Sequence, residues 1–462
     1  MDQLKLIDVR APIRRVLLVV PVLLALFGSW HASRWYIGNT MAEFAPQLTD
    51  AERSESELAL MRLDAARSAL RLAPNDPWTH WTYAGLEKSS FDPAALQEAL
   101  RHYEEAVRLS PNDYRFWMDL GRAREQAGDS LGGEKALRRA VELAPAYAYP
   151  RWLLGNLLLR AGRGDESFQE LRRAADADPK LRPQIFNVAW YVFGEDVRAV
   201  KDAVGNSPSA RAEFAAYLGG RKRFDDAMGL WASLSAAEKR EHRASGEALM
   251  NALVADKRYR AAQNILRDIA PENIAAVVSA EQFTNAGFES DVGALGAGIF
   301  GWQVASLPQA QVGVDPSYRH GGQRSLRILF KSPSTLEFKN VSQLVVVEPG
   351  TQYRFNCFVR TEDLKSAGTP LIEILDGANE RNVLGQSVPL PVGKSDWQPV
   401  TIDFKSPATT EAVRVRVSRA ACVGDPVCPI YGMVWYDDFS LQRLGGSPAP
   451  RGSGSAKSVA AR

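Results

Sequence analysis

Cysteine and histidine are scarce in this chain, and its positive and negative charges nearly balance. The 462 residues include three cysteines and five histidines, and the formal net charge is +2. The histidines stand too far apart to form a metal-ligand spacing, and a nearly neutral chain offers no broad attraction for nucleic acid. A nucleophile elbow, a phosphate loop and a recognisable pair of catalytic carboxylates are also missing. We therefore expect neither nucleic-acid binding nor enzymatic activity.

Apolar residues dominate a segment near the N-terminus. The stretch VLLVVPVLLALFGSW at 16–30 carries no charge, and several basic residues precede it. The segment from Val16 to Ile37 is about long enough to cross a bilayer as a helix, and the preceding basic residues favour a cytoplasmic N-terminus. We expect a cytoplasmic tail at 1–15, a transmembrane anchor at 16–37 and a linker at 38–49, with the remainder exported. A cleaved signal peptide is the alternative, although in SWHAS Trp30 or His31 occupies a position that cleavage requires to be small.

Two of the three cysteines lie in one loop-like segment, AACVGDPVCP. Outside the cytosol, Cys422 and Cys428 are expected to form a disulfide. A pair of zinc ligands is the alternative, but no second pair and no histidine is near in the sequence. Cys357 shares strand parity with Tyr353 and Phe355, so we expect it to be a buried thiol.

A sequence pattern recurs every 34 residues in the first half of the chain. Pro111, Pro145 and Pro179 follow this period, and so do Gly121 and Gly155. Each unit contains two helical segments separated by a glycine-containing turn, and a proline ends the second helix. A fixed period of this length indicates a helical repeat array, in which neighbouring units cover one another's apolar faces. The two glycines are expected to let the paired helices approach closely.

These units resemble the tetratricopeptide repeat family. The resemblance is strongest at Trp117, Leu120, Gly121, Ala140 and Pro145, and it weakens after residue 180. It implies an α-solenoid over 50–278 that has no chemistry of its own and binds proteins in a groove lined by the first helix of each unit. Carried over to this sequence, the groove residues are Arg115, Met118, Arg122, Trp152, Asn156 and Arg160. Alternatively, these side chains are solvated or simply pack between helices.

The periodicity changes after residue 278. Stretches such as AVRVRVSR and SLRILF alternate apolar and polar residues, which is typical of strands with one buried face. Several such strands with turns between them predict an all-β sandwich or jelly roll over 280–444. The tail at 445–462, rich in Gly, Ser, Pro and Ala, is expected to be disordered. The predicted fold is multidomain: one transmembrane helix, an α-solenoid and an all-β jelly-roll sandwich.

The order of motifs in the β segment resembles carbohydrate-binding jelly-roll modules of the galactose-binding-like superfamily. NAGFES opens the segment, HGGQRSLRI and VEPGTQYRFNCFVRT follow, and VWYDDFSLQ closes it. The resemblance implies a possible structural calcium where the first and last strands meet, with Glu289 and Asp438 as the matching ligands. The alternative is that the acidic residues end a strand and cap a turn. It also implies sugar binding, which needs exposed aromatic faces. The candidates are Tyr318, Tyr431, Trp302 and Trp397, of which both tryptophans alternatively belong to the core.

Together these features predict a single-pass protein of the bacterial inner membrane with its bulk in the periplasm. We expect a non-enzymatic scaffold that binds proteins through its repeats and glycan through its sandwich, in envelope or exopolysaccharide assembly or export. Its expected partners are polysaccharide-assembly proteins, a glycan and the membrane. The alternative is a pure protein-interaction scaffold whose sandwich docks or caps without binding sugar.

Overall fold

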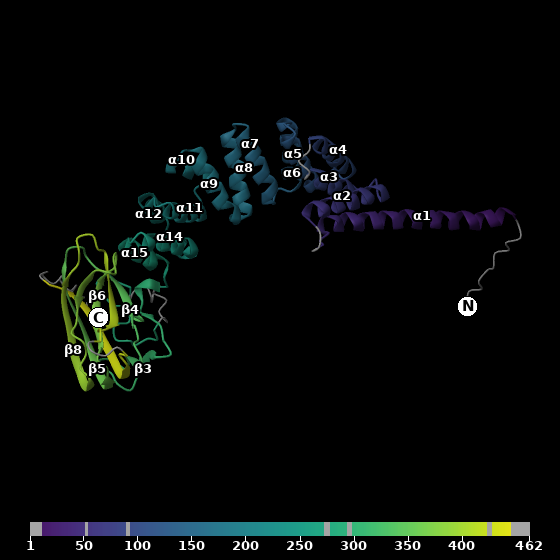
Figure 1. Cartoon of the computed structure of the whole chain (residues 1–462). Helices are drawn as coiled ribbons and strands as arrows, with labels where there is room; N and C mark the ends of the chain where they lie inside the picture. The colour runs from purple at the N-terminus through teal and green to yellow at the C-terminus, as the bar shows by residue number, and fades with distance from the viewer. Residues whose placement is uncertain are drawn as a thin grey trace, which may run out of the picture. The chain divides into compact units, whose positions relative to one another are not determined.

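The structure is a computed structural model of the 462-residue chain. It describes residues 12–50, 54–88, 93–271, 278–292, 298–422 and 427–444. Most of the predicted cytoplasmic tail and the whole predicted disordered tail at 445–462 lie outside the described residues. The chain forms two compact units, residues 1–205 and 206–462. Figure 1 shows helices from α1 to α15 and then strands, in chain order.

The first unit is built from helices that pair with their neighbours in sequence. They are α1 (Pro12–Phe44), α2 (Glu55–Leu72), α3 (Pro77–Lys88), α4 (Pro93–Leu109), α5 (Tyr114–Gln126), α6 (Ser130–Leu143), α7 (Ala148–Arg160), α8 (Gly164–Ala177), α9 (Arg182–Val192) and α10 (Val197–Val204), with short 3-10 turns at Ala45–Gln47 and Pro179–Leu181. The pairs are α1 with α2, α3 with α4, α5 with α6, α7 with α8 and α9 with α10. This arrangement confirms the predicted TPR-like helical repeat.

The repeated prolines and glycines act as the sequence predicts. Helices α4, α6 and α8 each end two residues before one of the periodic prolines, because the residue before a proline disfavours the helical conformation. Gly121 lies so close to α6 that a Cβ atom there would stand 2.7 Å from Cγ of Leu137. Gly155 has the same relation to Leu171, also at 2.7 Å. Close helix pairing therefore depends on glycine at both positions.

Helix α1 extends through the segment that we expected to be a linker. Its last residues pack against α2, where Gly38 leaves only 2.8 Å between a hypothetical Cβ atom and Cβ of Ala73. Arg34 also donates a hydrogen bond of 3.0 Å to the carbonyl of Arg71, near the end of α2. Residues 38–44 are thus the first helix of a repeat pair, and the predicted linker is wrong over this range. Among the described residues, no helix is long and apolar enough for a bilayer crossing, so the anchor predicted at 16–37 is not supported.

The second unit combines further helices with a β-sandwich. Its helices are α11 (Pro208–Gly220), α12 (Phe224–Ala232), α13 (Ala236–Glu241), α14 (Arg243–Ala255) and α15 (Tyr259–Ile269), and a 3-10 turn follows at Gly298–Phe300. Helix α11 pairs with α12 and α14 pairs with α15. The sequence periodicity changes after residue 278, but the helices before this point and the strands after it belong to one compact unit. Helix α15 packs against the sandwich within this unit.

The sandwich consists of two antiparallel five-stranded sheets. One has the order β1-β4-β9-β6-β7 and the other β2-β3-β10-β5-β8. The strands are β1 (Gln303–Val304), β2 (Ala310–Asp315), β3 (Ser325–Ser332), β4 (Val341–Val346), β5 (Gln352–Lys365), β6 (Pro370–Asp376), β7 (Val383–Gln386), β8 (Gly393–Lys405), β9 (Ala412–Arg419) and β10 (Ile430–Arg443). Alternate residues of each sheet fill one core, including Val413, Val415 and Val417 of β9. The predicted all-β two-sheet sandwich is therefore confirmed.

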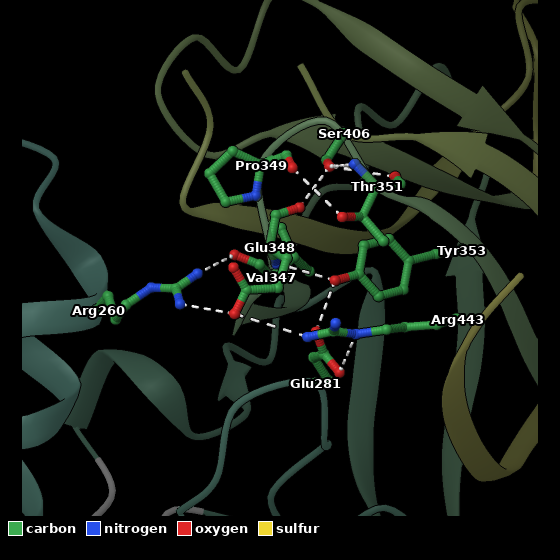
Figure 2. A network of polar contacts seen from close by, with 9 residues as sticks. All are labelled: Arg260, Glu281, Val347, Glu348, Pro349, Thr351, Tyr353, Ser406 and Arg443. Atoms are coloured by element: carbon green, nitrogen blue, oxygen red, sulfur yellow. Dashed lines mark hydrogen bonds and ion pairs between the residues drawn. The ribbon is translucent and has the colours of Figure 1, made fainter. Parts of the chain in front are cut away.

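Two residues at the start of α15 attach this helix to the sandwich. The buried Tyr259 hydroxyl donates to the carbonyl of Gly377 at 2.7 Å. The amide of Arg260 donates to the Glu411 carboxylate at 2.9 Å, and an anion is favourable at a helix N-terminus. The guanidinium of Arg260 contacts Glu348 at 2.6 Å, as Figure 2 shows. It also donates to the carbonyl of Val347 at 3.0 Å.

Figure 2 shows that the same network continues into the sandwich. The Glu348 amide donates to the Tyr353 hydroxyl at 2.8 Å, and that hydroxyl donates to Glu281 at 2.7 Å. Arg443 on β10 donates to Glu281 at 2.8 Å. The network joins α15, the β4–β5 loop, β5 and β10, so the last helical pair and the sandwich are linked by polar contacts as well as by packing.

Candidate functional site

An aromatic cluster lies on the outer face of the sheet that contains β5. The core takes Phe355, Cys357 and Val359 of this strand, so Phe358 and Arg360 point to the opposite face. The ring of His320, from the loop between β2 and β3, stacks on Phe358 with centroids 3.5 Å apart and an interplanar angle of 11°. A half-buried tryptophan of β8, Trp397, meets the His320 ring edge-on at 5.9 Å. A solvent-facing sheet surface is therefore aromatic where the strand pattern would place polar residues.

A second exposed ring adjoins this cluster. Tyr318 is 38% exposed, and the guanidinium of Arg360 lies 4.3 Å from its ring centroid. Arg360 is fixed by Asp396 at 2.9 Å, and the buried Trp435 contacts the Tyr318 ring edge-on at 4.9 Å. The Arg360 cation therefore lies against one face of the Tyr318 ring. Arg360 and Trp435 hold the ring in place but leave it partly exposed to solvent. Such a surface offers apolar faces with polar groups at their edges, which is what a pyranose ring requires.

The structure separates the four predicted glycan residues. Tyr318 and Trp397 belong to the aromatic cluster. Trp302 is buried at 5% exposure and stacks in the core against Phe283, so it offers no face to a ligand. This corrects the prediction for Trp302, whose alternative as a core residue holds. Tyr431 is 42% exposed, but it lies at the start of β10 in register with Lys331 and Lys365, outside the cluster.

Sequence reasoning missed Phe358, His320 and Arg360. Phe358 could have been found, because it is an aromatic residue at a polar position of the alternating stretch QYRFNCFVR. His320 had no such signal, since only the path of the β2–β3 loop brings it to β5.

The predicted calcium ligands contact the loop between β2 and β3. Glu289 accepts a hydrogen bond from the amide of Gln323 at 2.9 Å, and Asp438 contacts Nδ1 of His320 at 2.7 Å. The neighbouring Asp437 is fully buried and accepts from the His320 amide at 2.8 Å. Burial raises the pKa of Asp437, although hydrogen bonds from backbone amides oppose this effect. Within the described part of the chain, no three His, Cys, Asp or Glu side chains are grouped to hold a metal ion. The three carboxylates position the loop that carries His320, and the calcium assignment stays a prediction.

The first unit contains three adjoining cavities along the first helices of its repeat pairs. Their volumes are about 460, 500 and 640 Å³. The first two share Pro46, Trp81 and Thr82, and the second and third share Lys88, Arg122 and Gln126. We call this continuous depression on α3, α5 and α7 the groove. It lies where the repeat resemblance places a partner site.

Only part of the predicted groove set lines the groove. Arg122 and Arg160 do so. Arg115 forms a bidentate pair with Asp113 and lies 4.4 Å from the Trp78 ring centroid, so it braces α3 against α5. The remaining three predicted side chains are half-buried, and none lines a described cavity. Met118 packs with Leu137 and Leu154, while the Asn156 amide donates to the carbonyl of Trp152.

The groove walls carry residues that the repeat pattern did not indicate. Trp78 and Trp81 line one end, and the Trp81 indole donates to Asp119 at 2.8 Å. Asp119 also pairs with Arg122 at 3.2 Å, so this cation is neutralised within the protein. Lys88 lies where two cavities meet, and burial, followed by the nearby Arg122, lowers its pKa. The groove is therefore aromatic at one end and ionic at its centre.

The structure joins Cys422 and Cys428 in a disulfide, with Cα atoms 5.9 Å apart. Arg419 donates to the carbonyl of Cys428 at 3.2 Å and to that of Leu336 at 3.0 Å. Cys357 is a free, fully buried thiol whose pKa is raised by burial. The pair therefore closes a loop at the end of β9.

Comparison with known proteins gives two partial sequence matches. No family model matches the chain. It is 35% identical over 124 residues to cellulose synthase 2 operon protein C of Komagataeibacter xylinus, covering 26% of this chain and 9% of that protein. It is 28% identical over 113 residues to superkiller protein 3 of Schizosaccharomyces pombe, covering 24% of this chain and 8% of that protein. The chain therefore spans less than a tenth of the length of either relative.

Solved structures with related folds cover each half separately. The TPR protein YrrB, described as having an unusual peptide-binding site, matches 35% of this chain and 80% of its own, at a TM-score of 0.29 and 20% identity. A CBM4 structure matches 35% of this chain and all of its own, at a TM-score of 0.26 and 13% identity. Similarities of this strength carry no inference about ligand or partner.

Proposed function

We propose that this protein is a non-enzymatic scaffold in the assembly or export of a bacterial extracellular polysaccharide. Its groove would bind a protein of that machinery, and the outer sheet face would bind the polysaccharide. The observation that carries the proposal is the aromatic cluster of Phe358, His320, Trp397 and Tyr318 on a solvent-facing sheet. The partial match to a cellulose synthase operon protein supports the choice of polysaccharide.

Affinity electrophoresis of the full chain tests the glycan half. The gels contain soluble cellulose derivatives, mixed-linkage β-glucan or xylan, with starch and dextran as unrelated polymers. We expect retardation by at least one β-linked polymer and a loss of about tenfold or more in affinity for Trp397→Ala and Tyr318→Ala, because each removes a stacking face. Tyr431→Ala is the matched control, since it removes an exposed aromatic residue of the same sandwich outside the cluster. Equal losses in all three variants, or no retardation at all, would remove the glycan half.

The groove half is tested by crosslinking in an envelope extract of the native host, followed by mass spectrometry. Arg122→Ala alters the groove centre. Arg139→Ala is the control, because Arg139 lies on a second helix, α6, and pairs with its neighbour Glu142. We expect Arg122→Ala alone to lose a polysaccharide-assembly protein. Identical partners for both variants would contradict a groove site.

One observation favours the alternative, in which the sandwich only caps the solenoid. The contact of Tyr259 with Gly377 and the contact of Arg260 with Glu348, which Figure 2 shows, fasten α15 to the sandwich. Under this alternative, deletion of the sandwich destabilises α14 and α15 while every glycan in the panel fails to bind. The scaffold proposal also predicts that deletion of the sandwich destabilises α14 and α15, but it predicts that the full chain binds a glycan.

We also propose that the protein works outside the cytosol and breaks no bonds. The Cys422–Cys428 disulfide is consistent with an oxidising compartment. Non-reducing peptide mapping of protein alkylated inside its native cells should find this pair oxidised. A reduced pair would contradict the location, and clearing of a polysaccharide zymogram would contradict the absence of turnover.

A further inference from the structure

Two histidines face each other between α3 and α4. Nδ1 of His80 lies 2.8 Å from Nδ1 of His102, and the rings are 5.0 Å apart at their centroids. The other ring nitrogen of His80, Nε2, lies 2.8 Å from the carbonyl oxygen of Pro74. His80 is buried, and the His102 side chain is 18% exposed. Neither imidazole is used by the groove contacts described above.

The partners of these nitrogens fix where the protons are. A carbonyl oxygen only accepts, so Nε2 of His80 carries a hydrogen and its Nδ1 is the acceptor. His102 must then donate from its own Nδ1. A first added proton goes to Nε2 of His102, which faces a Glu98 carboxylate oxygen at 3.4 Å, and the contact between the rings survives. A second proton has only Nδ1 of His80 to occupy, and there it meets the N–H of a charged His102.

Charged and apolar groups around the pair act on its protonation in both directions. Burial and the neighbouring His80 lower the pKa of His102, whereas Glu98 and Glu87 act in the opposite direction. The Tyr83 ring meets His102 edge-on at 4.7 Å. The other charged or titratable groups of α2, α3 and α4 near the pair are Arg67, which lies over the Tyr83 ring, and Glu105, whose carboxylate interacts with both imidazoles. Full protonation therefore costs the hydrogen bond between the rings and adds a close repulsion.

The position of His80 ties this contact to the groove. Trp78 and Trp81, which flank His80 in α3, line the groove wall. The start of α3 is held to the preceding turn by the His80–Pro74 contact and by the Thr79 hydroxyl, which donates to the carbonyl of Ala73 at 2.9 Å. On the side of α4, His102 supplies the contact to His80. Loss of that contact removes the hydrogen bond that joins the first turn of α3, which carries Trp78, to α4.

We propose that the His80–His102 pair is an acid-sensitive lock between α3 and α4, and that a second proton opens the aromatic wall of the groove. The effect on partner binding rests on the proposed function. The lock itself is a property of the chain alone.

Proton binding to the pair is measured by NMR on the full chain labelled at histidine, titrated from about pH 8 to about pH 4.5. We expect the pair to titrate in two steps, with the second proton bound on the order of 100-fold more weakly than the first. His31, which is exposed on α1, serves as the internal reference. Uptake of both protons in a single step would overturn the lock.

The opening of α3 is measured by hydrogen exchange at about pH 7.5 and about pH 5, corrected for the intrinsic pH dependence of exchange. In His102→Asn an amide donor replaces the ring N–H, but the pair no longer takes up two protons. We expect exchange in 77–88 to rise about tenfold in acid in the unaltered chain and in the control His31→Gln, and to stay flat in His102→Asn. A parallel rise in all three would overturn the proposal. If His102→Asn does not fold, the NMR titration decides alone. Neither measurement involves a partner, so a failure of the groove proposal changes neither result.

Discussion

Replacing a glycine by alanine in the first helix of three successive repeat pairs should give opposite effects on stability. At Gly121 and Gly155 a Cβ atom would lie 2.7 Å from Cγ of a fully buried leucine and within 3.2 Å of a carbonyl oxygen on the paired helix. At Gly85 the nearest atom would be the Tyr103 hydroxyl oxygen, at an ordinary contact distance of 3.6 Å. Alanine is favoured over glycine in a helix by about 1 kcal/mol, whereas overpacking costs about 1–3 kcal/mol.

These opposing contributions set the size of the effect. Gly85→Ala should be neutral or stabilising by up to about 1 kcal/mol, and Gly121→Ala and Gly155→Ala should each destabilise by up to about 2 kcal/mol. For a unit of about 200 residues, a difference of about 2 kcal/mol between the variants corresponds to roughly 4–8 °C in Tm. Circular dichroism at 222 nm on heating the full chain reports the helices. A Gly121→Ala protein that melts at or above the temperature of Gly85→Ala would refute the close approach of α5 and α6.

Two further changes probe the second unit. Arg260→Ala should destabilise it by about 1 kcal/mol, because its ion pair with Glu348 is more than a third exposed and screened, and its bond to the Val347 carbonyl is a single hydrogen bond. Arg260 holds the pKa of Glu348 below its ordinary 4.5, so this stabilisation exists above that value and disappears as pH falls through the lowered pKa. The Tm difference between Arg260→Ala and the unaltered chain should therefore shrink on acidification, and a constant difference would contradict the ion pair. Replacing both Cys422 and Cys428 by serine should cost about 2 kcal/mol, since the disulfide closes a short loop. Reductant should lower the Tm of the unaltered chain to that of this variant, and an unchanged Tm would contradict the assignment.

The repeat architecture was predictable because its signals are local. The periodic prolines end α4, α6 and α8 through sterics between adjacent residues, and Gly121 and Gly155 recur at the helix position that faces a partner. Alternation in AVRVRVSR likewise set the buried face of β9. Segment 38–44 was misassigned because the polar and proline-containing stretch that follows it resembles a linker. Packing of Gly38 against Ala73 keeps this segment helical.

The binding surfaces were predictable only in part. Tyr318 was named from its aromatic character and its nearby turn residues, and Trp397 from its aromatic character with the core as its alternative; both lie at the aromatic cluster. Trp302 has the same character, but it packs on Phe283 in the core. No local signal distinguishes these environments, because each depends on which strand passes over the ring. In the groove, Arg122 was identified, whereas the Arg115 prediction could not anticipate that Asp113 and Trp78 occupy its guanidinium.

The sequence by itself determined which segments are helices or strands and which of their faces are apolar, because periodicity and turn chemistry act between residues a few positions apart. Only the tertiary structure decided which polar and aromatic groups meet. His80 reaches His102, His320 reaches Phe358 and Arg260 reaches Glu348 through the pairing of helices, the path of a loop and the docking of α15. Each of these contacts joins elements separated along the chain, and their geometry follows from packing that no short stretch of sequence encodes.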